Sequence, residues 1–134
     1  MRTLQYYTLL LLLILTMVGS ACSSAKPTMG QRGYTQEGKA SYYSNKLHGR
    51  KMANGQPYHR KKLTAAHRTL PFGTKVKVTN LQTNKSVKVK ITDRGPFVKG
   101  RIVDLSEAAA KRLDYIDEGV APVKVKVVKP APAR

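Results

Sequence analysis

Acidic side chains are scarce in this sequence, so the search for a catalytic acid is short. No Asp or Glu lies within residues 39–92, and Asp93 is the first carboxylate after them. The alternation of apolar and polar residues over 87–91 places Asp93 on the inner face of the same strand, directly before Arg94. A partly desolvated acid there can act as a proton donor, whereas an aspartate that fixes the turn is structural. From the residues alone, both interpretations stay open.

The remaining groups that could do chemistry point to no metal and no cofactor. Three histidines stand at spacings of 11 and 8, which match no short zinc motif, and no nearby carboxylate could orient them. They are His48, His59 and His67. No nucleophile elbow is present. Asp104 lies between apolar neighbours, and we expect it to pair with Arg94 or Arg101 in a structural role.

The elements that must position Asp93 are mostly strands. Strict alternation of valine or isoleucine with lysine or threonine predicts half-buried strands at residues 75–79, 87–91 and 123–127. Residues 38–43 and 101–105 predict two more, and Ser106 is expected to cap a short helix over 107–113. Residues 44–63 are expected to be irregular. Five or six short strands with one short helix fit a small closed β-barrel better than a sandwich.

The charge balance indicates an anionic partner. Lys and Arg number 25 against 7 Asp and Glu, for a net charge of +18. Lysines on strands also serve solubility, but here the compensating acids are missing as well. No recognition helix or base-stacking motif supports nucleic acid. We therefore expect anionic lipid headgroups or wall polymers as the partner.

The N-terminus predicts export. A basic start, an apolar run over residues 9–18 and small residues before Cys22 are typical of a signal peptide, and the run is too short to span a bilayer. The expected organisation is a signal peptide at 1–21, a lipidated Cys22 with a flexible linker to residue 37, a barrel at 38–128 and a disordered tail at 129–134. The alternative is an ordinary secreted protein with an incidental cysteine. If Cys22 carries lipid, no thiol remains for a disulfide.

Eight segments in order resemble the rare lipoprotein A (RlpA) family over about residues 38–128. They are Gly38-Lys39-Ala40-Ser41-Tyr42-Tyr43, His48-Gly49-Arg50, Ala53-Asn54-Gly55, Thr64-Ala65-Ala66-His67, Thr69-Leu70-Pro71-Phe72-Gly73-Thr74, Val78-Thr79-Asn80, Asp93-Arg94-Gly95-Pro96-Phe97 and Gly100-Arg101-Ile102-Val103-Asp104-Leu105-Ser106. The resemblance implies a six-stranded double-psi β-barrel with one or two short helices. The chain resembles a short form of the family without its glycan-binding SPOR domain.

The resemblance also implies an enzyme, an endolytic peptidoglycan lytic transglycosylase (a lyase), with Asp93 as its acid/base. That reaction cleaves the β-1,4 bond after N-acetylmuramic acid and forms a 1,6-anhydro sugar, so one acid can serve both steps. By the same resemblance His67 is a catalytic residue that orients or polarises groups in the cleft. The other expected cleft or substrate-binding residues are Tyr42, Asn54, Gln56, His59 and Arg94.

Four of the positions depart from the family pattern. Gln56 stands where the family usually has glutamate, His59 where it has aspartate, Tyr42 where tryptophan is common and Met52 where threonine is common. Because an amide cannot exchange a proton as a carboxyl does, a non-catalytic glycan binder or an expansin-like wall lipoprotein is the alternative function. In every case we expect an exported monomer that is anchored to a bacterial membrane through Cys22, faces the wall and contacts peptidoglycan. The residue after Cys22 is not aspartate, which favours the outer membrane of a Gram-negative cell.

Overall fold

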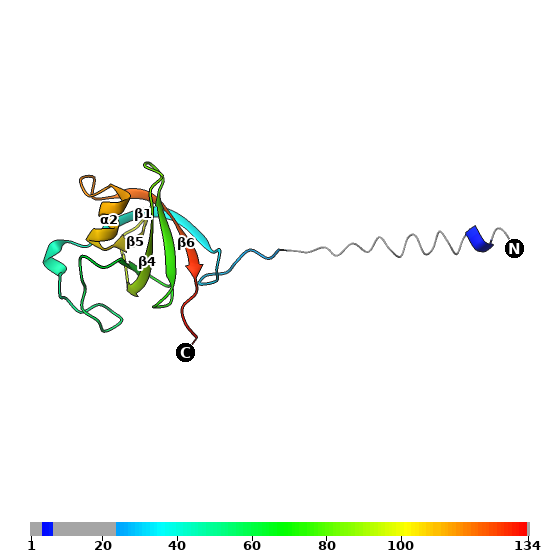
Figure 1. The fold of residues 1–134 in the computed structure, drawn as a ribbon, viewed down its shortest axis with the longest axis horizontal. Helices are drawn as coiled ribbons and strands as arrows, with labels where there is room; N and C mark the ends of the chain where they lie inside the picture. The colour runs from blue at the N-terminus through cyan, green and yellow to red at the C-terminus, as the bar shows by residue number, and fades with distance from the viewer. Residues whose placement is uncertain (1–3, 7–23, 134) are drawn as a thin grey trace.

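The chain folds into a closed six-stranded barrel (Figure 1). A computed structural model describes residues 4–6 and 24–133. Within the second range the strands are β1 (Thr35–Tyr42), β2 (Thr64–His67), β3 (Lys75–Asn80), β4 (Ser86–Asp93), β5 (Arg101–Leu105) and β6 (Ala121–Lys129). The helices there are the 3-10 helix η1 (Asn45–Leu47) and the α-helix α2 (Glu107–Leu113). The predicted mainly-β barrel of six strands with one or two short helices is confirmed.

Around the barrel the strands follow the order β1-β5-β2-β4-β3-β6, and β6 pairs with β1 to close it. The pairs β1–β5 and β2–β4 are parallel, whereas the other four pairs are antiparallel. The five predicted strand segments all form strands. The sixth strand, β2, was not predicted, because all four of its residues are buried and short, fully buried segments show no alternation.

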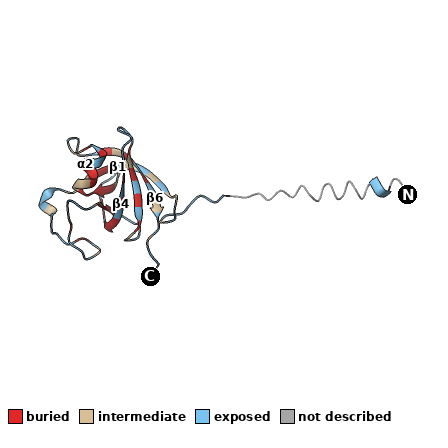
Figure 2. Ribbon diagram, in the orientation of Figure 1, coloured by how far each residue is buried: buried red, intermediate tan, exposed pale blue. Residues whose placement is uncertain are grey.

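The barrel interior is filled by the inward side chains of the alternating strands. The valines of β3 and β4, Ile91, and Val123, Val125 and Val127 of β6 are buried, while the lysines between them are exposed. Figure 2 shows this alternation as buried and exposed stripes along the strands. Helix α2 packs on the barrel through Ala109, Ala110 and Leu113, and Ser106 caps it by accepting from the Ala109 N–H as predicted.

The predicted linker is too long at its C-terminal end. Strand β1 begins at Thr35 rather than at residue 38, because the backbone there pairs with β6, with Thr35 opposite Lys126. The Gly33 N–H also donates to the Val127 carbonyl at 2.9 Å. These polar residues join the sheet through backbone hydrogen bonds, which side-chain patterns do not reveal.

The predicted tail and signal peptide lie at the two ends of the chain. Strand β6 ends at Lys129, and residues 130–133 have no regular structure. Cys22 and the predicted cleavage site lie outside the described residues, as does most of the predicted signal peptide. Among the residues that are described, no helix has the length and apolar character needed to cross a bilayer.

Candidate active site

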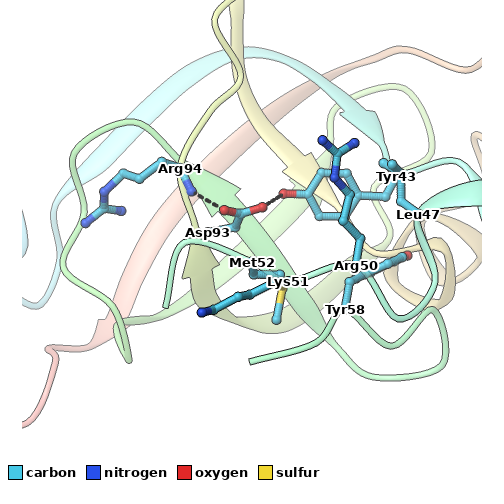
Figure 3. Close-up of a pocket in the computed structure, with 8 residues that line it drawn as sticks. All are labelled: Tyr43, Leu47, Arg50, Lys51, Met52, Tyr58, Asp93 and Arg94. Atoms are coloured by element: carbon cyan, nitrogen blue, oxygen red, sulfur yellow. Dashed lines mark hydrogen bonds between the residues drawn. The ribbon is translucent and has the colours of Figure 1, made fainter. Parts of the chain in front are cut away.

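A groove with a volume of about 300 Å³ opens where β1 and β4 end (Figure 3). Tyr43 directly follows β1, Asp93 is the last residue of β4, and the segment 47–58 supplies the opposite wall. The lining residues are Tyr43, Leu47, Arg50, Lys51, Met52, Tyr58, Asp93 and Arg94. Asp93 is the only carboxylate among them, and three of the other lining residues are basic.

The two oxygens of the Asp93 carboxylate have different partners. Oδ1 accepts the backbone N–H groups of Ala53 and Arg94, both at 2.8 Å. Oδ2 accepts the Tyr43 hydroxyl at 2.5 Å, and this bond is drawn in Figure 3. The two N–H groups on Oδ1 therefore fix the side chain, while Oδ2 is hydrogen-bonded to a hydroxyl that can also accept a hydrogen bond.

Tyr43 is held in place by packing and stays neutral. Its ring meets that of Tyr58 edge to face, with centroids 4.9 Å apart. Burial, and then the hydrogen bond and negative charge of Asp93, raise the pKa of the Tyr43 phenol above its ordinary value. The hydroxyl thus keeps its proton and donates a hydrogen bond to the Asp93 carboxylate.

The segment expected to be irregular is an ordered loop that presents a backbone donor to Asp93. Lys51 pairs with Pro57 in a β-bridge, and the Met52 N–H donates to the Gln56 carbonyl at 2.8 Å. Gly55, with φ at +87°, makes the tight turn between them. The Asn54 N–H donates to the carbonyl of Thr92 beside Asp93, at 3.2 Å. The turn is therefore tied to the end of β4, which brings the Ala53 N–H to the carboxylate.

Arg94 contributes its backbone to the site and its guanidinium to the scaffold. Nη1 donates to the carbonyls of His67 and Leu70 at 3.1 and 2.9 Å, and Cζ lies 3.9 Å from the centre of the Phe72 ring. Figure 3 shows this guanidinium directed away from the Asp93 carboxylate. Arg94 therefore braces the strand end that carries Asp93.

The expected ion pair of Asp104 forms with Arg101. Nη2 of Arg101 lies 2.5 Å from Oδ1 of Asp104, which also accepts the Ser41 hydroxyl at 2.8 Å. The alternative partner, Arg94, bonds carbonyls instead. The structural role predicted for Asp104 agrees with these contacts.

The His67 ring is buried in the turn after β2 rather than in the groove. Nδ1 accepts the N–H groups of Thr69 and Leu70 at 3.2 and 3.1 Å, which leaves the proton on Nε2, 3.0 Å from Oε1 of Gln36. Burial first, and then the charges of Arg94 and Arg68, lower the pKa of His67 to about 4. His67 is thus neutral, and it reaches the site only through its carbonyl, which holds Arg94.

Two further predicted cleft residues lie away from the groove. The Tyr42 hydroxyl donates to the Ile116 carbonyl at 3.1 Å, and its ring packs on Tyr115. Tyr42 therefore points to the opposite side from Tyr43, as alternation along a strand requires. His59 packs edge to face with His48, and the two rings line a separate hollow of about 510 Å³ with Asn45, Arg60 and Lys61.

Gln56 and Asn54 lie on the turn beside the groove. Oδ1 of Asn54 accepts the Gln56 N–H at 3.0 Å, which shapes the turn, and Gln56 is exposed. Neither lines the groove, although both neighbour the Ala53 donor to Asp93. The structure thus brings together Asp93 and Arg94, with Gln56 and Asn54 at the rim.

Sequence reasoning weighed Tyr43 and Tyr58 as sugar-stacking aromatics but favoured the core for them, and it gave no role to Arg50 or Lys51. The tyrosine pair at 42–43 does not say which ring faces the groove. Arg50 lies in one of the eight segments that resemble the family, which was the available signal for it. Among the residues that the structure describes, no group of three or more His, Cys, Asp or Glu side chains could hold a metal.

Comparisons of the sequence with a family model and with individual proteins point to the same family. The family model described as lytic transglycolase matches residues 35–125. The endolytic peptidoglycan transglycosylase RlpA of Campylobacter jejuni is 50% identical over 102 residues, which cover 76% of this chain and 37% of the relative. The RlpA of Pasteurella multocida is 52% identical over 97 residues, which cover 72% of this chain and 33% of the relative. The chain thus spans about a third of the length of these relatives.

Two solved structures share the fold. The Streptomyces papain inhibitor superposes with a TM-score of 0.58 at 27% identity, covering 73% of this chain and 97% of the inhibitor. An expansin of Clavibacter michiganensis superposes with a TM-score of 0.57 at 26% identity, covering 75% of this chain and 53% of the expansin. These likenesses confirm the double-psi β-barrel. The chain therefore belongs to the lytic transglycolase family, as its resemblance to the rare lipoprotein A family predicts.

Proposed function

We propose that the chain is an endolytic peptidoglycan transglycosylase that uses Asp93 as its single acid/base. The observation that carries the proposal is the solitary carboxylate in the groove. Hydrolysis of a glycosidic bond ordinarily needs two carboxylates, one as acid and one as base or nucleophile. Among the described residues that line the groove, Asp93 has no second acid beside it. A reaction in which the substrate supplies its own nucleophile fits this arrangement.

The proposed reaction needs no water. Protonated Asp93 gives its proton to the glycosidic oxygen as the bond to the anomeric carbon of N-acetylmuramic acid breaks. The C6 hydroxyl of the same sugar attacks that carbon, and its proton passes to Asp93. The products are a 1,6-anhydro sugar end and a free C4 hydroxyl, and the acid is regenerated.

The surroundings of Asp93 suit both halves of this cycle. Because two backbone N–H groups hold Oδ1, the proton is placed on Oδ2, next to Tyr43. A neutral phenol donates a hydrogen bond to an ionised carboxylate and accepts a hydrogen bond from a protonated one. Tyr43 therefore positions Oδ2 in both states without adding a second acid.

The basic groove and the relatives support a peptidoglycan substrate. Arg50, Lys51 and Arg94 line the groove, and peptidoglycan carries the carboxylates of its lactyl groups or stem peptides. The relatives from Campylobacter and Pasteurella are named for endolytic action on peptidoglycan. We propose that this chain acts as an exported monomer on the wall side of a bacterial membrane, to which the lipid on Cys22 anchors it.

Digestion of purified sacculi tests the proposal. The unsubstituted protein should release fragments that end in 1,6-anhydromuramic acid. Asp93→Asn should lower that release by about 10²–10⁴-fold, because the amide cannot deliver a proton. Its Oδ1 can still accept both N–H groups, so the melting temperature should change little. Asp117→Asn, which changes an exposed acid, is the matched control.

The alternative is a wall protein that binds glycan without cutting it. Gln56 and His59 favour it, since they replace two acids of the family pattern. If the unsubstituted protein is pulled down by sacculi but releases no anhydro ends, the enzyme proposal is wrong. Binding that survives Asp93→Asn together with a mechanical effect on the wall would favour an expansin-like role.

A further inference from the structure

Six exposed lysines form two rows across three neighbouring strands of the barrel. In one row Lys75 of β3 lies between Lys90 of β4 and Lys129 of β6. In the other row Lys77 lies between Lys88 and Lys126, on the same three strands. We call these six residues the lysine lattice. Neighbouring strands are about 4.8 Å apart and alternate residues about 7 Å apart, so the lattice is a compact two-dimensional array of charge.

No side chain that the structure describes compensates the charge of the lattice. None of its six lysines takes part in the four ion pairs formed among the described residues. Like charges directly opposite each other on paired strands are destabilising, and the lattice contains four such pairs. Protection of a sheet edge does not explain them, since the barrel is closed and these strands have partners on both sides.

The lattice lies on a different part of the barrel from the candidate active site. None of its residues lines the groove around Asp93. On β4, which belongs to both, Lys88 and Lys90 are on the exposed face of the strand, whereas the groove opens at its end, at Asp93. A glycan bound in the groove therefore leaves the lattice free for a second partner.

The chain reaches the barrel beside this face. Thr35, the first residue of β1, pairs with Lys126, and the Gly33 N–H bonds the neighbouring carbonyl of Val127. Figure 1 shows the segment before β1 leaving the barrel next to β6. Lys26 and Arg32 add two exposed charges to that segment. Whatever surface holds the N-terminus is thereby brought close to the lattice.

We propose that the lysine lattice docks the barrel on an anionic phospholipid surface. A two-dimensional array of cations suits a plane of headgroups better than a single polymer strand, which would call for a groove. Attraction between lysines and anionic headgroups acts within about 10 Å at 0.1 M salt, so the lattice must lie close to the membrane. In this orientation the groove, which none of the lattice lysines lines, is left free for the wall polymer.

Sedimentation with vesicles tests the proposal. Every residue of the hydrophobic core lies within residues 40–127, so residues 24–134 are produced alone, without the lipid that would mask the effect. They should bind vesicles of three parts phosphatidylcholine to one part phosphatidylglycerol at 50 mM NaCl, and at least tenfold less tightly at 300 mM. Vesicles of phosphatidylcholine alone should bind at least tenfold less tightly as well. The lattice variant carries Lys75→Gln, Lys77→Gln, Lys88→Gln and Lys90→Gln, and it should lose at least tenfold in binding.

Two matched variants keep the test decisive. Lys39→Gln, Lys46→Gln, Lys62→Gln and Lys99→Gln together remove the same charge elsewhere and should bind within twofold of the unsubstituted domain. Lys75→Arg, Lys77→Arg, Lys88→Arg and Lys90→Arg together keep the charge and should retain binding. This variant therefore separates the loss of charge from any effect of substitution on folding. Equal binding by the lattice variant and the first control would overturn the proposal. Binding to purified sacculi but not to the anionic vesicles would overturn it too and assign the lattice to the wall polymer.

Discussion

The two oxygens of the Asp93 carboxylate are held by different neighbours. One oxygen is fixed by the N–H groups of Ala53 and Arg94, and the other shares a hydrogen bond with Tyr43. The backbone turn that supplies Ala53 also carries Gln56, where the family pattern has an acid. The position of the missing carboxyl is therefore on the same short turn that donates to Asp93.

Gln56→Glu is expected to raise the release of 1,6-anhydro ends by about tenfold or more. A carboxylate at the rim can stabilise positive charge that develops on the sugar in the transition state, which an amide does far less well. The rate of product release from sacculi, at saturating and at low substrate, measures the change. Gln82→Glu adds the same charge at an exposed site between β3 and β4, and it should leave the rate unchanged. Equal rates for Gln56→Glu and the unsubstituted protein would show that the amide is not limiting.

The lowered pKa of His67 predicts how the free energy of unfolding depends on pH. Its pKa is about 4 in the folded protein and near 6.5 in the unfolded chain, so protonation favours unfolding. The contribution of neutral His67 to the free energy of unfolding is fully present above pH 6.5. It is lost as the pH falls toward 4, for a total of about 3 kcal/mol. Denaturant unfolding at pH 7 and pH 4 should show that loss. His67→Asn keeps an acceptor for the N–H groups of Thr69 and Leu70 but has no group that titrates in this range. Between pH 7 and pH 4 its free energy of unfolding should fall by about 3 kcal/mol less than that of the unsubstituted protein. Parallel pH profiles for the two proteins would contradict this account.

At the scale of elements, the segment after β4 is fixed by one side chain. The Arg68 guanidinium donates to the carbonyls of Pro96, Val98 and Arg101 at 2.6, 3.0 and 2.9 Å. Three bonds from one rigid group hold the loop that leaves Asp93, and a lysine cannot reach all three acceptors. The loop therefore depends on arginine at this position.

Arg68→Lys is expected to lower the free energy of unfolding by about 1–3 kcal/mol. The amide hydrogens of residues 95–101 should exchange faster with solvent, and release of anhydro ends should fall because Asp93 is less well placed. Hydrogen exchange followed by mass spectrometry measures the first effect. Arg112→Lys, on the exposed side of α2, should leave both readouts unchanged. Unaltered exchange in 95–101 would show that Arg68 does not hold the loop.

The elements differ in how far the sequence could predict them. Strands β3, β4 and β6 follow from alternation, since each has one buried and one exposed face. Strand β2 has no exposed face and the start of β1 has no apolar pattern, so only pairing partners distant in sequence define them. At the site, Asp93 could be predicted from its place on β4. The choice between Tyr42 and Tyr43 could not, because it depends on which way the strand end turns.

At the scale of the whole molecule, charge opposes folding. Without the first 21 residues, the chain still carries a net charge of +17, and the lysine lattice concentrates part of it on one wall. Salt screens such repulsion, with a Debye length of about 30 Å at 0.01 M that shortens to about 10 Å at 0.1 M. The folded domain should consequently be more stable in salt, opposite to the trend for proteins held by exposed ion pairs.

The melting temperature of residues 24–134 is therefore expected to rise by about 5 °C or more between 10 and 500 mM NaCl. The four-lysine lattice variant, with glutamine at 75, 77, 88 and 90, should melt higher than the unsubstituted domain at 10 mM and respond less to salt. This follows because its substitutions remove all four like-charge pairs between paired strands. The equal-charge control with glutamine at 39, 46, 62 and 99 separates local from overall repulsion. Should both variants show the same reduced salt response, net charge alone would be responsible and the lattice would have no special energetic role.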